Sequence, residues 1–376
     1  MERDVKQSME NIRTFCRRKN ITVSLQRYGI DALSAMAQGL FCTLLVGTIL
    51  NTLGQQLNIG FLNEIIVTLK QGEHEISYTI GGLASAMVGP GIAVAIGLAL
   101  QAPPLVLFSL IPVGFAANAM GGAGGPLAVY AIAIIASECG KLVSKETKID
   151  ILVTPIVTIL AGVGTASVIA APIGAAAAAV GDFVKWATVL QPFWMGMMVS
   201  VVIGMALTLP ISSAAICAAL GLTGLAGGAA VAGCCAQMVG FAVMSFRENR
   251  WGGLVAQGIG TSMLQMPNIV KNPRIWIPPT LAAAITGPIA TCLFRLEMNG
   301  SAVSSGMGTC GFVGQIGVYT GWLAEIAAGS RSAITAFDWL GLVLICFVLP
   351  AILSWCFCQV LRKIGWIREN DLKLDL

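Results

Sequence analysis

Long apolar runs, separated by short polar segments, dominate the pattern of this chain. A helix that crosses a bilayer needs about 20 mostly apolar residues, because its backbone must satisfy its own hydrogen bonds across roughly 30 Å of hydrocarbon. Apolar segments lie near residues 30–53, 79–101, 103–118, 123–140, 150–173, 188–209, 213–244, 278–296, 307–328 and 336–360. The pattern predicts an all-α polytopic membrane protein with about ten transmembrane helices.

Two glycine-rich stretches interrupt these runs, at residues 119–126 and 221–230. Small residues let membrane helices approach closely, but dense glycine beside proline disfavours a continuous helix. Non-helical backbone at membrane depth is tolerated where it is buried within protein, and transporters place ligands at such breaks. We therefore expect broken helices or re-entrant hairpins at these positions.

The distribution of charge sets the expected topology. Only 11% of residues are charged, against roughly 25% in soluble domains, and the net charge is +4. Lys and Arg gather in residues 1–27 and again in the tail 361–376, on either side of a transmembrane domain of residues 28–360. Because basic residues resist translocation, we expect both termini on the cytoplasmic side of a bacterial inner membrane. Residues 1–27 favour amphipathic contact with anionic membrane lipid, and no nucleic-acid partner is expected.

A weak internal similarity divides the chain into two halves. Leu100-Gln-Ala-Pro-Pro-Leu-Val106 resembles Leu264-Gln-Met-Pro-Asn-Ile-Val270, and a second echo follows each copy. In that second echo Met120, Gly121, Gly124 and Glu138 have the same mutual spacing as Met307, Gly308, Gly311 and Glu325. Either residues 30–145 and 190–330 form an internal repeat, or the similarity arises by chance in a chain rich in glycine and alanine.

Uncharged hydrogen-bonding side chains concentrate in the second half, over residues 246–320. A hydroxyl that leaves water must be matched by a donor or acceptor, whereas buried full charges are costly. This composition favours a sugar or another small polar, neutral solute over an ion. The candidate substrate-binding residues are Glu297, Asn299, Gln265, Asn268, Gln315, Ser304 and Thr309.

Glu297 is the most conspicuous of these candidates, because an acidic group at membrane depth is expensive and commonly marks a substrate or proton path. The alternative is an interfacial position, where lipid headgroups would solvate it together with Arg295. The chain contains no CxxC pair, no phosphate-binding loop and no HExxH motif. We accordingly expect no catalytic residue, no metal site and no cofactor.

Three segments together resemble a known family. They are Ser245-Phe-Arg-Glu-Asn249, Gly258-Ile-Gly-Thr-Ser-Met-Leu-Gln-Met-Pro-Asn-Ile-Val-Lys-Asn-Pro-Arg-Ile-Trp-Ile-Pro-Pro-Thr280 and Gly306-Met-Gly-Thr-Cys-Gly-Phe-Val-Gly-Gln315. From about residue 20 to 360 the chain is similar to the membrane IIC component of the bacterial phosphotransferase system, in a divergent branch that includes toxin-gene-regulator-like members. The resemblance implies about ten spans with re-entrant hairpins, usually a homodimer, and a sugar that a partner IIB protein phosphorylates.

The chain departs from that pattern in one important motif. The Gly-Ile-Thr-Glu-Pro type motif of sugar-transporting relatives is absent, and Glu297-Met-Asn-Gly300 is the nearest substitute. Because residues 361–376 are only a short charged tail, we expect any IIA or IIB phosphocarrier to be a separate protein. Three functions therefore stay open: a IIC-type sugar permease, an ion-coupled or uncoupled solute transporter, and a membrane sensor that regulates gene expression.

Overall fold

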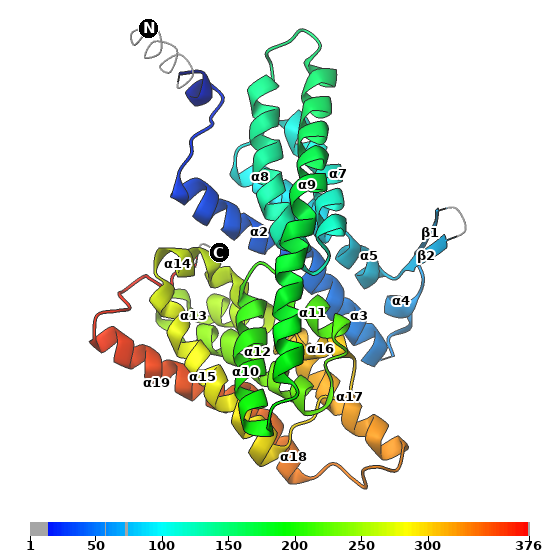
Figure 1. Ribbon diagram of the computed structural model, residues 1–376, viewed down its shortest axis with the longest axis vertical. Helices are drawn as coiled ribbons and strands as arrows, with labels where there is room; N and C mark the ends of the chain where they lie inside the picture. Colours follow the sequence, from blue (N-terminus) through cyan, green and yellow to red (C-terminus); the bar gives the residue numbers. More distant parts are fainter. Residues whose placement is uncertain (1–13, 57, 72–73, 375–376) are drawn as a thin grey trace. The chain divides into compact units, whose positions relative to one another are not determined.

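The computed structural model describes residues 14–56, 58–71 and 74–374, most of them in helices (Figure 1). The chain divides into two compact units. Unit 1 comprises Met1–Leu40 and Met87–Gly174, and unit 2 comprises Phe41–Ala86 and Ala175–Leu376. The long helix α9 (Asp150–Ala187) contributes to both units.

Unit 1 is a helical bundle. Within it α6 packs against α2, α7 and α8, and α7 also packs against α8. Its elements are η1 (Arg27–Asp31), α2 (Ala32–Leu40), α6 (Val88–Ala99), α7 (Pro104–Gly121), η3 (Gly122–Gly124), α8 (Gly125–Val143) and the first part of α9.

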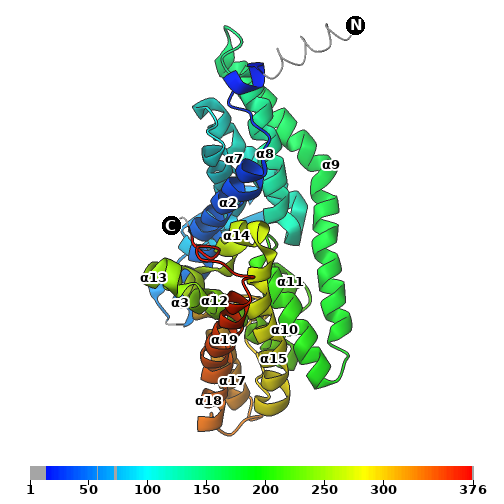
Figure 2. The same cartoon turned by 90° about the vertical axis from the view of Figure 1, so that its left-hand side faces the viewer.

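Unit 2 is built around α12, which is buried along most of its length. The helices α10, α15 and α19 lie beside α12, as Figures 1 and 2 show. The elements of unit 2 before α12 are η2 (Phe41–Leu45), α3 (Val46–Gln56), α4 (Gly60–Asn63), β1 (Val67–Gln71), β2 (His74–Tyr78), α5 (Ile80–Ala86), α10 (Pro192–Thr208) and α11 (Ser213–Ala219). From α12 onward they are α12 (Gly224–Met244), α13 (Phe246–Val255), η4 (Ala256–Gly260), η5 (Ser262–Gln265), α14 (Met266–Lys271), η6 (Pro273–Trp276), α15 (Ile277–Pro288), η7 (Ile289–Phe294), α16 (Ala302–Ser305), η8 (Cys310–Phe312), α17 (Val313–Ala327), α18 (Ala336–Val343), η9 (Leu344–Val348) and α19 (Leu349–Lys363).

The helices confirm a polytopic membrane protein but do not confirm the predicted number of spans. Among the described residues six helical stretches are long and apolar enough to cross a membrane: Arg27–Gln55, Pro104–Val143, Asp150–Ala187, Gly224–Met244, Pro273–Phe294 and Ala336–Lys363. The pair α5 and α6, bent by 53°, brings the number to as many as seven, and α10 is a shorter apolar helix. About ten spans are therefore not confirmed.

The glycine clusters break helices at both positions that the sequence indicates. Helix α7 ends at Gly121, and Gly122 adopts φ +52°, a left-handed conformation that a residue with a Cβ rarely adopts. Likewise α11 and α12 are separated by residues 220–223, so the apolar run 213–244 is not one helix as expected. In both halves of the proposed repeat a 3₁₀ turn, η3 or η8, precedes the helix that carries Glu138 or Glu325.

Close helix contacts in unit 2 depend on glycine. A Cβ at Gly287 of α15 would lie 2.2 Å from the carbonyl oxygen of Gly196 in α10. A Cβ at Gly233 of α12 would lie 1.8 Å from the carbonyl oxygen of Ser200, also in α10. Association of helices in lipid relies on such backbone approach, because lipid tails are as apolar as the helices themselves.

One element lies outside the all-α prediction. Strands β1 and β2 form an antiparallel pair in which Val67 faces Tyr78 and Lys70 faces Glu75. An ion pair of 2.6 Å joins the Lys70 Nζ to the Glu75 carboxylate. The run is too short and too polar for a span, and its alternation of apolar and polar residues is typical of a strand.

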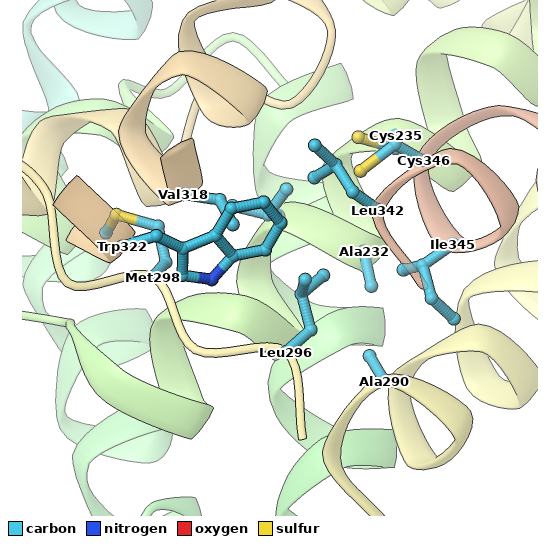
Figure 3. Packing of buried hydrophobic residues seen from close by; sticks show 11 residues of the cluster. Ala232, Cys235, Ala290, Leu296, Met298, Val318, Trp322, Leu342, Ile345 and Cys346 are labelled. Atoms are coloured by element: carbon cyan, nitrogen blue, oxygen red, sulfur yellow. The ribbon is translucent and has the colours of Figure 1, made fainter. Parts of the chain in front are cut away.

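A buried cluster fixes the loop that follows η7. Trp322 of α17, only 2% exposed, lies beside Met298 and Val318 in Figure 3. Met298 also pairs with Gly224 at the start of α12 through two backbone hydrogen bonds of 3.0 Å. Burial of a large aromatic ring dominates the packing of such a cluster. It therefore holds residues 296–299 against α12 and α17.

Candidate binding site

A pocket in unit 2 is lined entirely by uncharged residues. It has a volume of about 290 Å³, close to the lower limit of roughly 300 Å³ for small-molecule sites. Helix α3, the α16 segment and helix α17 form its walls. We call this cavity the α3–α17 pocket. Its lining residues are Thr48, Asn51, Thr52, Gln55, Ser301, Val303, Ser304, Val313, Ile316, Gly317 and Thr320.

Helix periodicity explains how two helices present this lining. The α3 residues have positions i, i+3, i+4 and i+7, which place them on one face of the helix. The α17 residues Val313, Ile316, Gly317 and Thr320 repeat the same spacing. Gly317 brings α16 close, since a Cβ there would lie 2.6 Å from the Ser304 Cβ. The local sequence therefore creates a polar face on α3 opposite a small-residue face on α17.

Asn51 has a fixed orientation in this pocket. The Thr79 hydroxyl donates a 2.7 Å hydrogen bond to the Asn51 side-chain carbonyl oxygen. Within the described part of the chain, the Asn51 amide nitrogen makes no hydrogen bond, nor does the side chain of Gln55. These amide groups are free to pair with hydroxyls of a guest.

Of the seven residues predicted from sequence, Ser304 lines this pocket. Thr309 and Gln315 face α12, where the Thr309 hydroxyl lies 3.6 Å from the Met238 sulfur and the Gln315 amide lies 3.1 Å from the Cys235 sulfur. The Gln315 side-chain oxygen is buried without a hydrogen-bond partner in the described structure.

Gln265 and Asn268 hold the carboxyl-terminal tail. The Gln265 amide donates to the Leu372 carbonyl oxygen at 3.0 Å, and the Asn268 amide donates to the Lys373 carbonyl oxygen at 2.8 Å. The two side chains also bond to each other at 2.9 Å, and Gln257 extends the network. Their donors are thus satisfied by the backbone of residues 372–373.

Glu297 and Asn299 lie at the other end of α17. The Asn299 amide donates to Glu297 at 3.1 Å and to Glu325 at 2.5 Å. Glu325 in turn pairs with Arg331 at 3.0 Å, and Arg331 also pairs with Asp338 at 2.5 Å. Burial acts to lower the pKa of Arg331, but its hydrogen bonds to Asp338 and Glu325 outweigh burial and raise that pKa above its ordinary value. Glu297 itself pairs with no cation in the described residues.

The sequence-based prediction does not include the polar face of α3, because its first residues lie inside the apolar run 30–53. The spacing of Thr48, Asn51, Thr52 and Gln55 carries the signal that identifies it, and Thr320 has the matching position on α17. The seven predicted residues thus occupy separate places in unit 2. Ser304 and the neighbouring Ser301, from the polar segment 246–320, line the same pocket as the polar face of α3.

Unit 1 contains a separate buried charge cluster. Lys141, 2% exposed, pairs with Glu138 at 2.8 Å and donates to the carbonyl oxygens of Asn20 and Leu100. Arg27 also donates to the Leu100 carbonyl at 2.6 Å. In the adjacent loop, hydrogen bonding from Lys19 lowers the pKa of Glu146. The interactions tie the segment before α2 to α6 and α8, which is a structural role.

Several apolar spans, helices broken at glycines and a neutral polar pocket define a multi-pass membrane protein of the transport class. Residues 30–374 match the family model described as phosphotransferase system, EIIC. The chain belongs to this family and is, at family level, a phosphotransferase-type membrane permease. Neither the comparison with curated proteins nor that with solved structures found a significant match.

Proposed function

We propose that this chain carries a sugar, or a similar neutral polyol, across the bacterial inner membrane and binds it in the α3–α17 pocket. The observation that carries the proposal is the neutral lining of that pocket, where the Asn51 amide nitrogen and the Gln55 side chain have no hydrogen-bond partner among the described residues. Each sugar hydroxyl that leaves water needs a partner, and amide and hydroxyl side chains provide partners without the cost of burying a charge.

The family supports separate IIB and IIA phosphocarriers as partners, as well as a sugar substrate. We propose that these proteins phosphorylate the sugar as it reaches the cytoplasm, so that the product does not return. The basic segments at both ends support cytoplasmic termini. A homodimer stays a prediction from the resemblance.

The test is a binding titration on the purified, full-length protein. Asn51→Leu removes the free donor and preserves side-chain size, so we expect affinity for the sugar to fall about tenfold, as for the loss of one good hydrogen bond. Gln191→Leu is the matched control, since Gln191 is exposed at the start of α10, outside the pocket.

The sugar itself is found by a thermal-shift panel of sugars and polyols, because a ligand that binds only the folded state raises its apparent stability. Equal affinity for Asn51→Leu and the wild type would contradict the assignment of the pocket. A panel in which no sugar or polyol shifts the unfolding temperature would contradict the substrate class.

A further inference from the structure

The carboxyl-terminal tail of unit 2 folds back onto α13 and α14. The Asn249 side chain bonds to the tail twice, to the Leu372 carbonyl oxygen at 2.7 Å and to the Leu374 amide at 2.8 Å. The Leu372 side chain is fully buried. Asn272 adds bonds to the Trp366 carbonyl oxygen and to the Asp371 carboxylate. These contacts fix residues 366–374 in one place.

The docked tail completes a basic pocket of about 410 Å³. Four basic side chains, Arg247, Arg250, Arg362 and Lys373, line it against two carboxylates. Glu248 is occupied by Arg362 at 2.6 Å. Within the described residues, Arg247, Arg250 and Lys373 have no carboxylate within ion-pair distance. The pocket therefore presents an excess of positive charge that suits an anion.

An apolar groove of about 310 Å³ lies next to the basic pocket, and Arg247 lines both. Its walls include Phe246, Trp251, Leu254 and Trp355. The Phe246 and Trp251 rings pack edge to face with centroids 5.3 Å apart. Trp251 is 70% exposed and Trp355 is 50% exposed, so these rings have a large apolar area that the chain itself leaves uncovered.

Helix α19 lines both cavities, so they follow one another along a predicted membrane span. Trp355, Gln359 and Arg362 have positions i, i+4 and i+7 on this helix, which ends the apolar stretch Ala336–Lys363. Over roughly 10 Å of helix the lining therefore changes from aromatic to amide to guanidinium toward the end of the span. Tryptophan and arginine at a span end are typical of the membrane interface.

We propose that the basic pocket and the apolar groove together bind one anionic phospholipid. Its phosphate lies between Arg247, Arg250 and Lys373, and an acyl chain lies along Trp251 and Trp355. Charge complementarity selects an anionic headgroup, and the direction of the gradient on α19 matches the direction from acyl chain to headgroup.

Native mass spectrometry of the full-length protein in neutral detergent tests this proposal, with phosphatidylglycerol as the probe. A cation near a lipid headgroup changes affinity about fivefold, so Arg247→Gln combined with Arg250→Gln should weaken phosphatidylglycerol binding about 25-fold. Lys185→Gln is the control for loss of a positive charge elsewhere on the surface, because Lys185 is exposed on α9 and lines neither cavity. Trp251→Ala should also weaken binding of the lipid.

Two comparisons identify the source of the anion. Phosphatidylcholine should bind much more weakly than phosphatidylglycerol, and inorganic phosphate at millimolar concentration should not displace the lipid. Equal binding of the two lipids, full displacement by phosphate, or unchanged affinity in the Arg247 and Arg250 double variant would each overturn the proposal. Unfolding temperatures measured without lipid show that the variants are folded, and a double variant that fails to fold is replaced by Lys373→Gln.

Discussion

At the residue scale, identical side-chain chemistry serves different purposes in different places. The Asn51 amide nitrogen has no hydrogen-bond partner among the described residues, whereas that of Asn268 donates to the tail and that of Asn299 donates to two carboxylates. A buried polar group must find a partner, and the sequence does not say whether that partner is a ligand or the chain itself. The tail contact joins Asn268 to Lys373, 105 residues away, which no local pattern predicts.

Glu297 allows a test of the original site prediction. It lies on the loop that continues to Ser301 of the α3–α17 pocket, and it lacks a cation partner in the described chain. The original site prediction has Glu297→Gln abolish measurable sugar binding and leave the fold intact, because a neutral amide replaces the charged acceptor. Binding confined to the α3–α17 pocket, which Glu297 does not line, leaves the affinity unchanged. Glu325→Gln is the comparison: it breaks the ion pair with Arg331 and should lower the unfolding temperature instead. Unchanged affinity in the Glu297 variant would remove this residue from the site.

At the element scale, regular features follow from sequence more readily than breaks and partners do. The apolar runs locate most of the helices, and the glycine clusters locate the breaks at Gly122 and Gly221. The four-residue polar face on α3 was equally available from spacing alone. Its opposite wall on α17 is about 265 residues away along the chain, so the pocket itself could not be predicted from local pattern.

Glycine packing between α10 and α15 gives a prediction about stability. Gly287→Ala would force a Cβ to within 2.2 Å of the Gly196 carbonyl oxygen, and overpacking of this kind costs about 1–3 kcal/mol. Gly164→Ala on α9 is the control, because nothing lies within 4 Å of its added Cβ, and there helix propensity should stabilise slightly. Reversible unfolding of the detergent-solubilised variants measures both. Equal free energies of unfolding would show that the α10–α15 contact adapts without cost.

At the scale of the whole molecule, the family and the apolar helices indicate a multi-pass permease. The property that distinguishes the candidate functions is whether transport is coupled to phosphorylation or to an ion gradient. A phosphotransferase-type permease traps its substrate by phosphorylation. An ion-coupled transporter instead accumulates the free sugar, and a sensor binds a ligand without flux.

Uptake into vesicles distinguishes these functions. We expect radiolabelled sugar to appear inside as its phosphate, and only when cognate IIB and IIA proteins and a phosphoryl donor are supplied. Accumulation of unmodified sugar in response to a proton or sodium gradient would contradict phosphorylation coupling. Protein-free vesicles supply the background.

Ligand protection of the α3–α17 pocket is the most direct measurement of the central claim. In Thr52→Cys the new thiol lines the pocket, and its labelling by a maleimide can be quantified at that position by mass spectrometry, separately from the exposed native Cys42, Cys292 and Cys356. A cysteine at exposed Ser330, outside the pocket, is the control. With a saturating sugar we expect labelling at position 52 to slow at least about tenfold, since bound ligand excludes the reagent, and labelling at position 330 to be unchanged. Labelling at position 52 that proceeds at the same rate with the sugar bound would contradict the account.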